Sequence, residues 1–222
     1  MKEQLQKDFD NTIRNLTLSQ KDIEIKKFYL DNFINKGFPN RREEDWKFSD
    51  LNQIIKKNIG ELSFYSDYTS TNKVDTSAFV DGLEHNKIVF INGRIEKIDF
   101  DYEKKDQIEI IDQSETINKF NNNSSLSDLN SAFTNKSFKI VVKEGYQLTK
   151  PLIIYHTTNS KIWSKNINLR LNFELYENSS LRLIDLFRDT SEKNFLNIFY
   201  NFDLKENSIL KNYKVDRFEN KN

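Results

Sequence analysis

A short polar turn recurs between apolar strands in the second half of the chain, and this repeat restricts the possible folds more than any other feature. The segment ENSSL at 177–181 returns as ENSIL at 206–210, twenty-nine positions later, and KEGYQL at 143–148 is a looser copy about thirty-three positions earlier. Each copy contains Asn or Gly, residues that tolerate the left-handed backbone of a turn. Units that repeat at roughly 30 residues are typical of a β-helix or related solenoid. A plain meander sandwich gives similar spacing, so the repeat alone leaves both folds open.

The hydrophobic period is two after residue 136, which predicts a series of strands. In one of them, apolar residues at the odd positions 169–175 alternate with polar residues at the even positions 170–176. We expect the odd positions to be buried and the even positions to face water. The expected strands are 138–142, 152–155, 169–176, 181–187, 195–204 and 209–215.

The first 61 residues predict helices. Apolar residues between Leu5 and Leu16 recur at three- and four-residue steps, which is one face of an amphipathic helix. Ser19 and Asp22 resemble a capping pair for a second helix, and Gly37 is placed to end it.

A third helix is predicted after Pro39. Asn40, with Glu43 three positions on, is expected to cap it, and its face includes Trp46. Apolar residues from 51 to 59 continue the helical spacing, and Gly60 is expected to end this helix.

The middle of the chain, residues 62–135, predicts a small α/β linking region. Loop with weak strands is expected up to residue 81. The pair Asn92-Gly93 between apolar runs in 88–98 predicts a hairpin, because both central residues of a type I′ turn need positive φ. A strand at 108–111 and a short helix at 126–133 follow. The expected regions are therefore 1–61, 62–135 and 136–222, and the fold class is α+β, mainly β.

Composition excludes several classes of function. Lys plus Arg equals Asp plus Glu at 34 each, so we expect no nucleic-acid binding. The chain contains no Cys, which fits a reducing compartment. Its apolar runs are far shorter than the roughly 20 residues of a membrane span, and its start is polar where a signal peptide is apolar. We expect a cytoplasmic protein that does not bind membranes.

Residues that could carry catalysis or bind a cofactor are few. No nucleotide-binding or nucleophile-elbow motif occurs among the five glycines. His85 lies in a polar loop and is expected to be exposed, whereas His156 ends a strand and is expected to be structural rather than a ligand. We therefore expect no enzyme, and we assign no catalytic, cofactor-binding or metal-binding residue.

Other charged and aromatic residues have simple structural interpretations. The acidic run at 43–45 complements a helix dipole, and Trp46 is expected to be a core or packing residue. Trp163, in a polar connection, either contacts a partner or covers a coil. Lyase-type and hydrolase-type solenoids group charged residues on one face, but the candidates on the strands fit a water-facing side equally well. These candidates are Arg170, Glu174, Arg182 and Asp185.

One segment carries a family resemblance. The sequence GFPNRREEDWKFSDL at 37–51 is similar to the N-terminal signature of SufD, a member of the SufB/SufD family. Three further segments agree in order, at 89–94, 129–133 and 140–151, so the resemblance covers most of residues 35–185. It implies a helical N-terminal region followed by the first coils of a right-handed parallel β-helix.

The resemblance also implies a function. Such proteins are non-catalytic scaffold subunits that pair with a SufB-like paralogue and a SufC-like ABC ATPase to assemble iron–sulfur clusters. This chain resembles the N-terminal half only, so the cluster ligands are expected beyond residue 222 and the cluster at the level of the complex, with no cofactor on this chain alone. A solenoid end without a cap is also expected to self-associate. The alternative is a β-solenoid carbohydrate-binding or polysaccharide-lyase-like protein.

Overall fold

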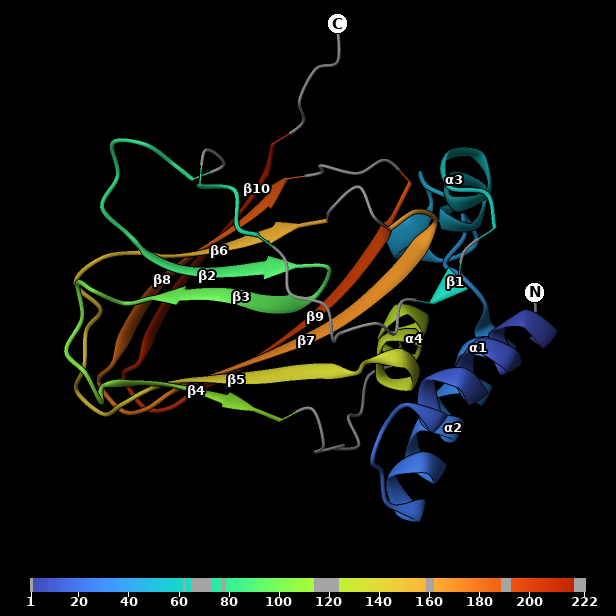
Figure 1. The fold of residues 1–222 in the computed structure, drawn as a ribbon, viewed down its shortest axis with the longest axis horizontal. Helices are drawn as coiled ribbons and strands as arrows, with labels where there is room; N and C mark the ends of the chain where they lie inside the picture. Colours follow the sequence, from blue (N-terminus) through green and yellow to red (C-terminus); the bar gives the residue numbers. More distant parts are fainter. Residues whose placement is uncertain are drawn as a thin grey trace, which may run out of the picture.

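The computed structural model describes residues 2–61, 63–64, 73–76, 79–113, 124–158, 162–188 and 193–217. This part of the chain is α+β and mainly β, as predicted, with helices at one end of the strands (Figure 1). The elements in chain order are α1 (Lys2–Arg14), α2 (Gln20–Lys36), a 3-10 helix (Glu44–Trp46), α3 (Leu51–Asn58), β1 (Ser63–Phe64), β2 (Asn86–Ile91), β3 (Arg94–Asp99), β4 (Ile108–Asp112), α4 (Ser125–Phe133), β5 (Lys136–Val142), β6 (Leu152–Thr157), β7 (Lys165–Leu175), β8 (Ser180–Arg188), β9 (Phe195–Leu204) and β10 (Ile209–Arg217).

The strands form two five-stranded mixed sheets. The first has the order β1-β7-β5-β4, with β9 also paired to β7, and the second has the order β10-β8-β6-β2-β3. From β5 to β10 the chain alternates between the two sheets, and the neighbours within each sheet are parallel. The antiparallel pairs are β2 with β3 and β4 with β5. A meander, whose consecutive strands are antiparallel neighbours, does not describe β5 to β10.

The sequence repeat corresponds to the strand register. Leu169 faces Ile198 across the β7–β9 pair and Leu181 faces Leu210 across the β8–β10 pair, in each case twenty-nine positions apart. The turns stack as well, because the Gly145 N–H donates to the carbonyl of residue 177 (2.8 Å) and the residue 178 N–H donates to that of residue 206 (3.0 Å). All three turns contain a residue with positive φ: Gly145 (69°), Asn178 (56°) and Asn207 (55°).

The main core lies between the two sheets. The odd positions of β7 point into it and are buried, as predicted. The prediction that the even positions face water is wrong for Arg170, which is only 7% exposed. Its guanidinium donates to the side chains of Asn130 (3.3 Å) and Ser131 (2.8 Å), so α4 lies over this part of the outer face.

Two helices occupy the first part of the chain, and the second begins and ends where the sequence predicts. The Ser19 side chain accepts from the Asp22 N–H (3.2 Å) and caps α2, while Gly37, at φ 75°, ends it. These helices and α4 form a second core around Leu30, Phe33 and other buried residues. In the described part of the chain, no helix has both the length and the apolar character of a membrane span.

The prediction of a single third helix is wrong. The structure has a 3-10 helix at Glu44–Trp46 and a separate α3, because the Asp50 carboxylate accepts from the Gln53 N–H (2.9 Å) and caps a new helix. Asn40 instead helps to form the preceding turn, where its side chain accepts from the Arg42 N–H (3.1 Å). Trp46 is half-buried on this turn and is not a core residue.

The predicted hairpin is confirmed. Strands β2 and β3 pair antiparallel, and Asn92 (φ 54°) and Gly93 (φ 79°) both have the positive φ that a type I′ turn requires. A register shift between Val89 and Phe90 adds a bulge. β2 also pairs with β6, so the hairpin belongs to the second sheet.

Candidate functional site at the β9–β10 end of the sheets

Within the residues that the structure describes, strands β9 and β10 each leave one edge of their sheet unpaired. In the described ranges, β9 pairs only with β7 and β10 only with β8. Consecutive strands lie in opposite sheets, so both edges border the same end of the core. Unpaired N–H and C=O groups along such edges can pair with another chain.

Strands β9 and β10 form the two walls of this end of the core, and the walls differ in chemistry. Tyr200 and Phe202 of β9 are partly buried and pack against the main core. On β10, Leu210 also packs against the core, so the even positions point inward and place Lys214 and Asp216 there. The Lys214 ammonium lies 5.1 Å from the centre of the Tyr200 ring. One wall is therefore apolar and the other carries charge.

A buried polar network lies directly beneath this end. The Tyr200 hydroxyl donates to Asp185 Oδ1 (2.5 Å), and His156 Nε2 lies 3.3 Å from the same oxygen and 2.9 Å from the hydroxyl. The His156 ring stacks between Phe90 and Phe187, its register neighbours in the second sheet. The three polar side chains thus connect the two sheets across an otherwise apolar core.

Burial determines the charge state of this network. It lowers the pKa of His156, although the hydrogen bond and charge of Asp185 act in the opposite direction. Burial and the Asp185 carboxylate raise the pKa of Tyr200, which keeps its proton and acts as the donor. Asp185 Oδ2 has no hydrogen-bond partner in the described part of the chain. His156 is buried and hydrogen-bonded within this network.

The prediction for His85 is wrong. Its side chain is only 2% exposed: Nδ1 lies 2.6 Å from the Leu83 carbonyl, and Nε2 lies 2.7 Å from the Tyr155 hydroxyl. Tyr155 belongs to β6, seventy positions along the chain, and no local pattern indicates this contact.

The four charged strand candidates do not form one site. Arg170 bonds to α4, Glu174 pairs with Lys139, and Asp185 belongs to the buried network. The Arg182 guanidinium donates to the carbonyl of residue 149 (3.0 Å). Each therefore has a separate set of partners.

The remaining predicted residues lie on the surface of the molecule. Trp163 is 53% exposed, with the Lys193 ammonium 5.1 Å from its ring centre. In the acidic run, Glu44 pairs with Lys47 (2.9 Å), and the Glu43 side chain accepts from the Asn40 N–H (3.2 Å). Neither place brings catalytic groups together.

A buried lysine that sequence reasoning missed caps α4. Lys26 Nζ donates to the carbonyls of Ser131 (3.4 Å), Ala132 (3.3 Å) and Thr134 (2.7 Å), where the helix ends. Burial and the charge of Arg170 lower its pKa to about 7. The only indication of this burial in the sequence is the position of Lys26 among the apolar residues of α2.

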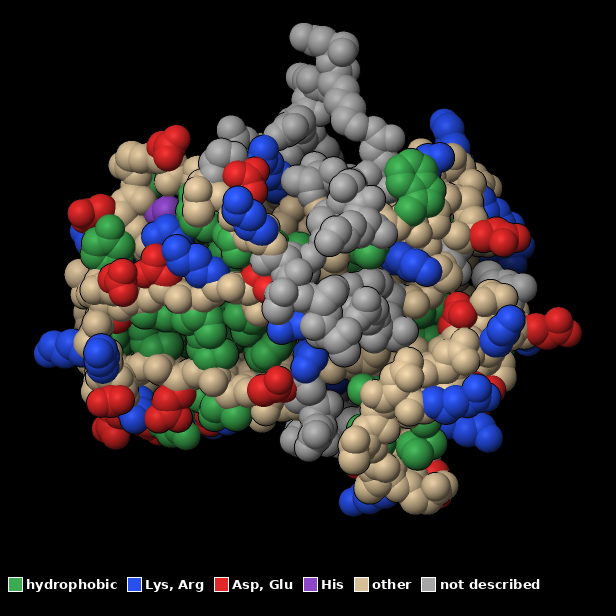
Figure 2. Space-filling model, viewed as in Figure 1, with side chains coloured by type: hydrophobic (Ala, Val, Ile, Leu, Met, Phe, Trp, Pro, Cys, Tyr) green, Lys and Arg blue, Asp and Glu red, His purple; other side chains and the backbone are tan. Residues whose placement is uncertain are grey.

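The molecule has two further surface features. A cleft of about 440 Å³ lies beside α1 and α3, with Leu5, Phe38, Ile55 and Phe64 in its lining. Figure 2 shows hydrophobic side chains between β3 and β4, at the opposite end of the core from β9 and β10. The edge strands there, β3 and β4, are six and five residues long, whereas β9 and β10 are ten and nine residues long.

Over the described residues, no group of three His, Asp or Glu could hold a metal ion.

Comparisons with known proteins do not assign a family. No family model matches the chain, and a search of curated proteins found no match.

Proposed function

We propose that this chain is a non-catalytic scaffold subunit of a cytoplasmic iron–sulfur assembly complex of the SufBCD type, acting through protein–protein contacts. Its partners are a SufB-like paralogue and a SufC-like ABC ATPase. We also propose that β5 to β10 form the first coils of a right-handed parallel β-helix. The chain's lack of Cys suits a reducing compartment.

The observation that carries the proposal is the pair of edges that β9 and β10 leave unpaired in the described part of the chain. A strand edge binds another chain through main-chain hydrogen bonds, while neighbouring pockets select side chains. Leu204, at the end of β9, is 47% exposed and provides apolar surface beside one edge. A surface of this kind supports a scaffold that works by contact.

The name of the assembly comes from the sequence resemblance. The 37–51 segment closes into a compact loop, since the Leu51 N–H donates to the Pro39 carbonyl (3.1 Å). Helices α1 to α3 precede the strands, in the order that the resemblance implies. The parallel register at twenty-nine positions supports the β-helix part of the proposal.

Co-purification tests this function. The tagged chain is expected to recover SufB-like and SufC-like proteins from a native lysate in which both are expressed. The variant L204E is expected to reduce recovery, because it places a charge beside the β9 edge. F28E changes another exposed apolar residue, on α2, and is the matched control. Failure to recover either partner, with both present, would contradict the proposal.

The isolated chain is expected to hold no stable cluster and to hydrolyse no ATP, because the resemblance assigns both to the complex. Anaerobic reconstitution with iron and sulfide checks the first expectation. Stoichiometric iron and sulfide on the purified chain would show that it binds the cluster by itself. The carbohydrate alternative gains no support, since its four candidate residues have separate partners.

A further inference from the structure

The cleft beside α1 and α3 has the size of a small-molecule site. Its volume of about 440 Å³ lies within the range of roughly 300–1,000 Å³ that ligand pockets occupy. Its lining comes largely from α1, α3 and β1, which lie at the helical end of the molecule (Figure 1). Residues from three elements therefore converge on one hollow.

The apolar part of the lining is held in place by the helical core. Phe64 stacks on Phe133 with the ring centres 3.6 Å apart, and Phe38 packs edge-on against Phe33 at 5.1 Å. Leu5 is buried in the same core. Because these side chains are already fixed, a ligand loses little free energy in ordering them. Such a lining suits an apolar body, and an aromatic one in particular.

One carboxylate in the lining lacks a hydrogen-bond donor. Asp8 Oδ1 accepts from the Gln4 side chain (2.9 Å), whereas Oδ2 is buried and has no hydrogen-bond partner in the part of the chain that the structure describes. The charges of two lysines act on this carboxylate. Lys7 is exposed, and Lys165 donates to the Ser63 hydroxyl (2.8 Å), so neither supplies the missing donor.

Burial makes this carboxylate a favourable partner for a cation. It raises the pKa of Asp8, and the hydrogen bonds from the Gln4 side chain and the Phe64 backbone offset burial only in part. A cation in the cleft would stabilise the ionised form, since charges are weakly screened away from water. Glu61 and Lys56 also line the cleft, but both are exposed and their charges are opposite. The preference for a charged ligand therefore depends on Asp8.

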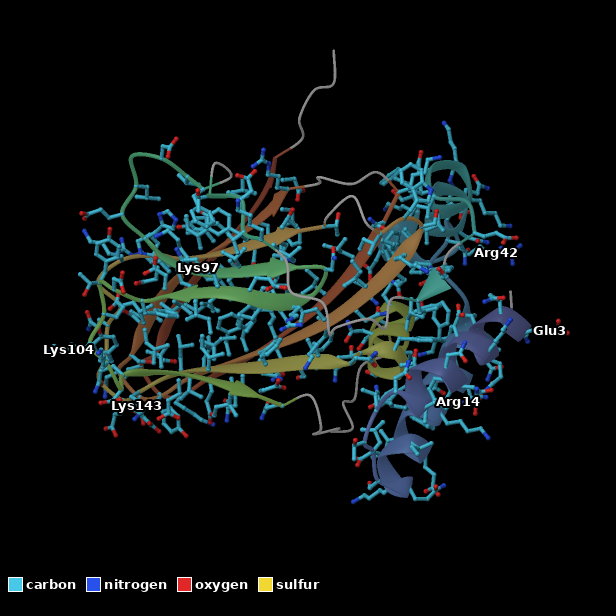
Figure 3. All side chains as sticks on the ribbon, in the orientation of Figure 1. Glu3, Arg14, Arg42, Lys97, Lys104 and Lys143 are labelled. Carbon is cyan, nitrogen blue, oxygen red and sulfur yellow. The ribbon has the colours of Figure 1, made fainter. Side chains whose placement is uncertain are left out.

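We propose that this cleft binds a small amine with an aromatic or other apolar body, and that the ammonium group of the ligand pairs with Asp8. An ammonium group has three N–H donors, and the exposed Gln4 side chain can move aside to admit it to the carboxylate. A carboxylate elsewhere on α1 does not suffice, since Glu3 points away from the rest of the molecule (Figure 3). This inference does not rest on the proposed function, because a chain that recovers no SufB-like partner can still bind the amine.

Methyl NMR of the full chain measures this binding, with 4-phenylbutylamine as the probe. Titration is expected to shift the methyl signals of Leu5 and Ile55, which line the cleft, with a dissociation constant of about 1 mM or lower. Ile54, exposed on α3 and outside the lining, is the internal control, and its signal should not move. The matched alcohol and the matched carboxylic acid are expected to bind at least about fivefold and about tenfold more weakly than the amine.

D8N tests the role assigned to the carboxylate. It keeps the shape of the side chain and removes its charge, so the amine is expected to bind within about twofold of the alcohol, with the affinity for the alcohol unchanged. D10N is the matched control. Asp10 accepts from Gln6 (3.1 Å) as Asp8 does from Gln4, but it is exposed and outside the lining, so D10N should keep the wild-type preference.

Thermal unfolding by circular dichroism checks that both variants are folded, and the comparison of the three ligands on the wild type needs no variant. A wild type that binds no amine at roughly 10 mM would overturn the inference. So would a wild type that binds the acid as tightly as the amine, or one in which Ile54 shifts as much as Ile55. A folded D8N chain that still prefers the amine would also overturn it.

Discussion

At the scale of single residues, the buried polar groups are the most informative side chains. Asp185 is fully buried, and the described part of the chain supplies only two polar partners for its carboxylate, Tyr200 and His156. Removing one partner of a buried polar pair lowers the free energy of unfolding more than replacing both partners by apolar groups. The network is therefore expected to show strong coupling between its members.

Removing the Tyr200 hydroxyl tests this coupling. Y200F is expected to lower the free energy of unfolding by about 2 kcal/mol, because Asp185 stays buried with one donor fewer. Y200F/D185L is expected to lose less than the sum of the two single variants, as measured by urea denaturation. Y213F, on an exposed tyrosine of β10, should stay within about 0.5 kcal/mol of the wild type. Additive effects would show that the network contributes no coupling.

Lys26 gives a pH dependence with a defined sign. Its pKa is about 7 in the folded chain, below the ordinary value of 10.5, so the unfolded chain binds more protons between these values. Stability therefore rises with pH across this window and falls as the pH drops toward 7. Between pH 7 and pH 9 the wild type is expected to gain about 2 kcal/mol relative to K26M.

Urea denaturation at the two pH values measures this gain. K27M, on the exposed neighbouring lysine of α2, is the control and should keep the wild-type slope. If the free energy of unfolding depended on pH in the same way for K26M and the wild type, Lys26 would stay charged when buried.

At the scale of elements, Glu103 connects three parts of the chain. Its carboxylate accepts from the Asn86 side chain (2.7 Å), the Tyr146 hydroxyl (2.7 Å) and the N–H groups of Thr149 and Lys150 (both 3.1 Å). Burial acts to raise its pKa, but the hydrogen bonds from Tyr146, Asn86, Lys150 and Thr149 outweigh burial and lower it. The loop after β3 is thereby held to the start of β2 and of β6.

E103Q tests this connection. The amide keeps the shape of the side chain but presents an NH₂ group to donors, so a loss of about 2 kcal/mol is expected. The charged Glu103 carboxylate stabilises the fold at pH values above the pKa of Glu103 in the unfolded chain. This stabilisation is lost as the pH falls through the lower pKa that Glu103 has in the folded chain. The difference between E103Q and the wild type should therefore shrink in acid. E144Q, in the exposed turn nearby, should change little, and a similar loss in both variants would contradict the role of Glu103.

Local sequence predicts some elements better than others. The hairpin was predictable because Asn92-Gly93 determines the turn by itself. The third helix was not, because Asp50 competes with Asn40 as a cap and ends the continuity of the apolar spacing. The burial of His85 depends on Tyr155, and that of Lys26 on carbonyls 105 to 108 positions away, so neither leaves a local pattern.

At the scale of the whole molecule, α4 joins the two cores. Leu129 and Phe133 belong to the helical core, while the Asn130 amide donates to the carbonyls of Leu169 (3.1 Å) on β7 and Asn197 (2.7 Å) on β9. Helices and sheets therefore share one element, and unfolding is expected to be a single transition.

Two tryptophans make this cooperativity measurable. Variants W163F and W46F leave one reporter each, in the helical and the sheet part, and their urea curves are expected to coincide. N130A removes both of these hydrogen bonds, together with those that the Asn130 Oδ1 accepts from Arg170 and Thr134, and is expected to separate the curves, with the helical part unfolding first. N172A, on β7 but bonded to Gln113 and Ser137, is the control and should keep coincident curves. Separate curves in the wild type would mean that the two cores are independent.

The twenty-nine-residue register has a consequence for how such a molecule can grow. Inserting one complete copy of that length would stack leucine on leucine and turn on turn, and would lengthen the core by roughly 4.8 Å. Adding a single residue would turn every later side chain to the wrong face. In-frame duplication of one unit is thus a neutral step for packing, and the offsets of 33 residues in the β5–β7 pair and 31 in the β6–β8 pair place smaller changes of length in the connections between strands. A molecule built in this way can therefore lengthen by whole repeats, each of which adds one strand to each of the two sheets.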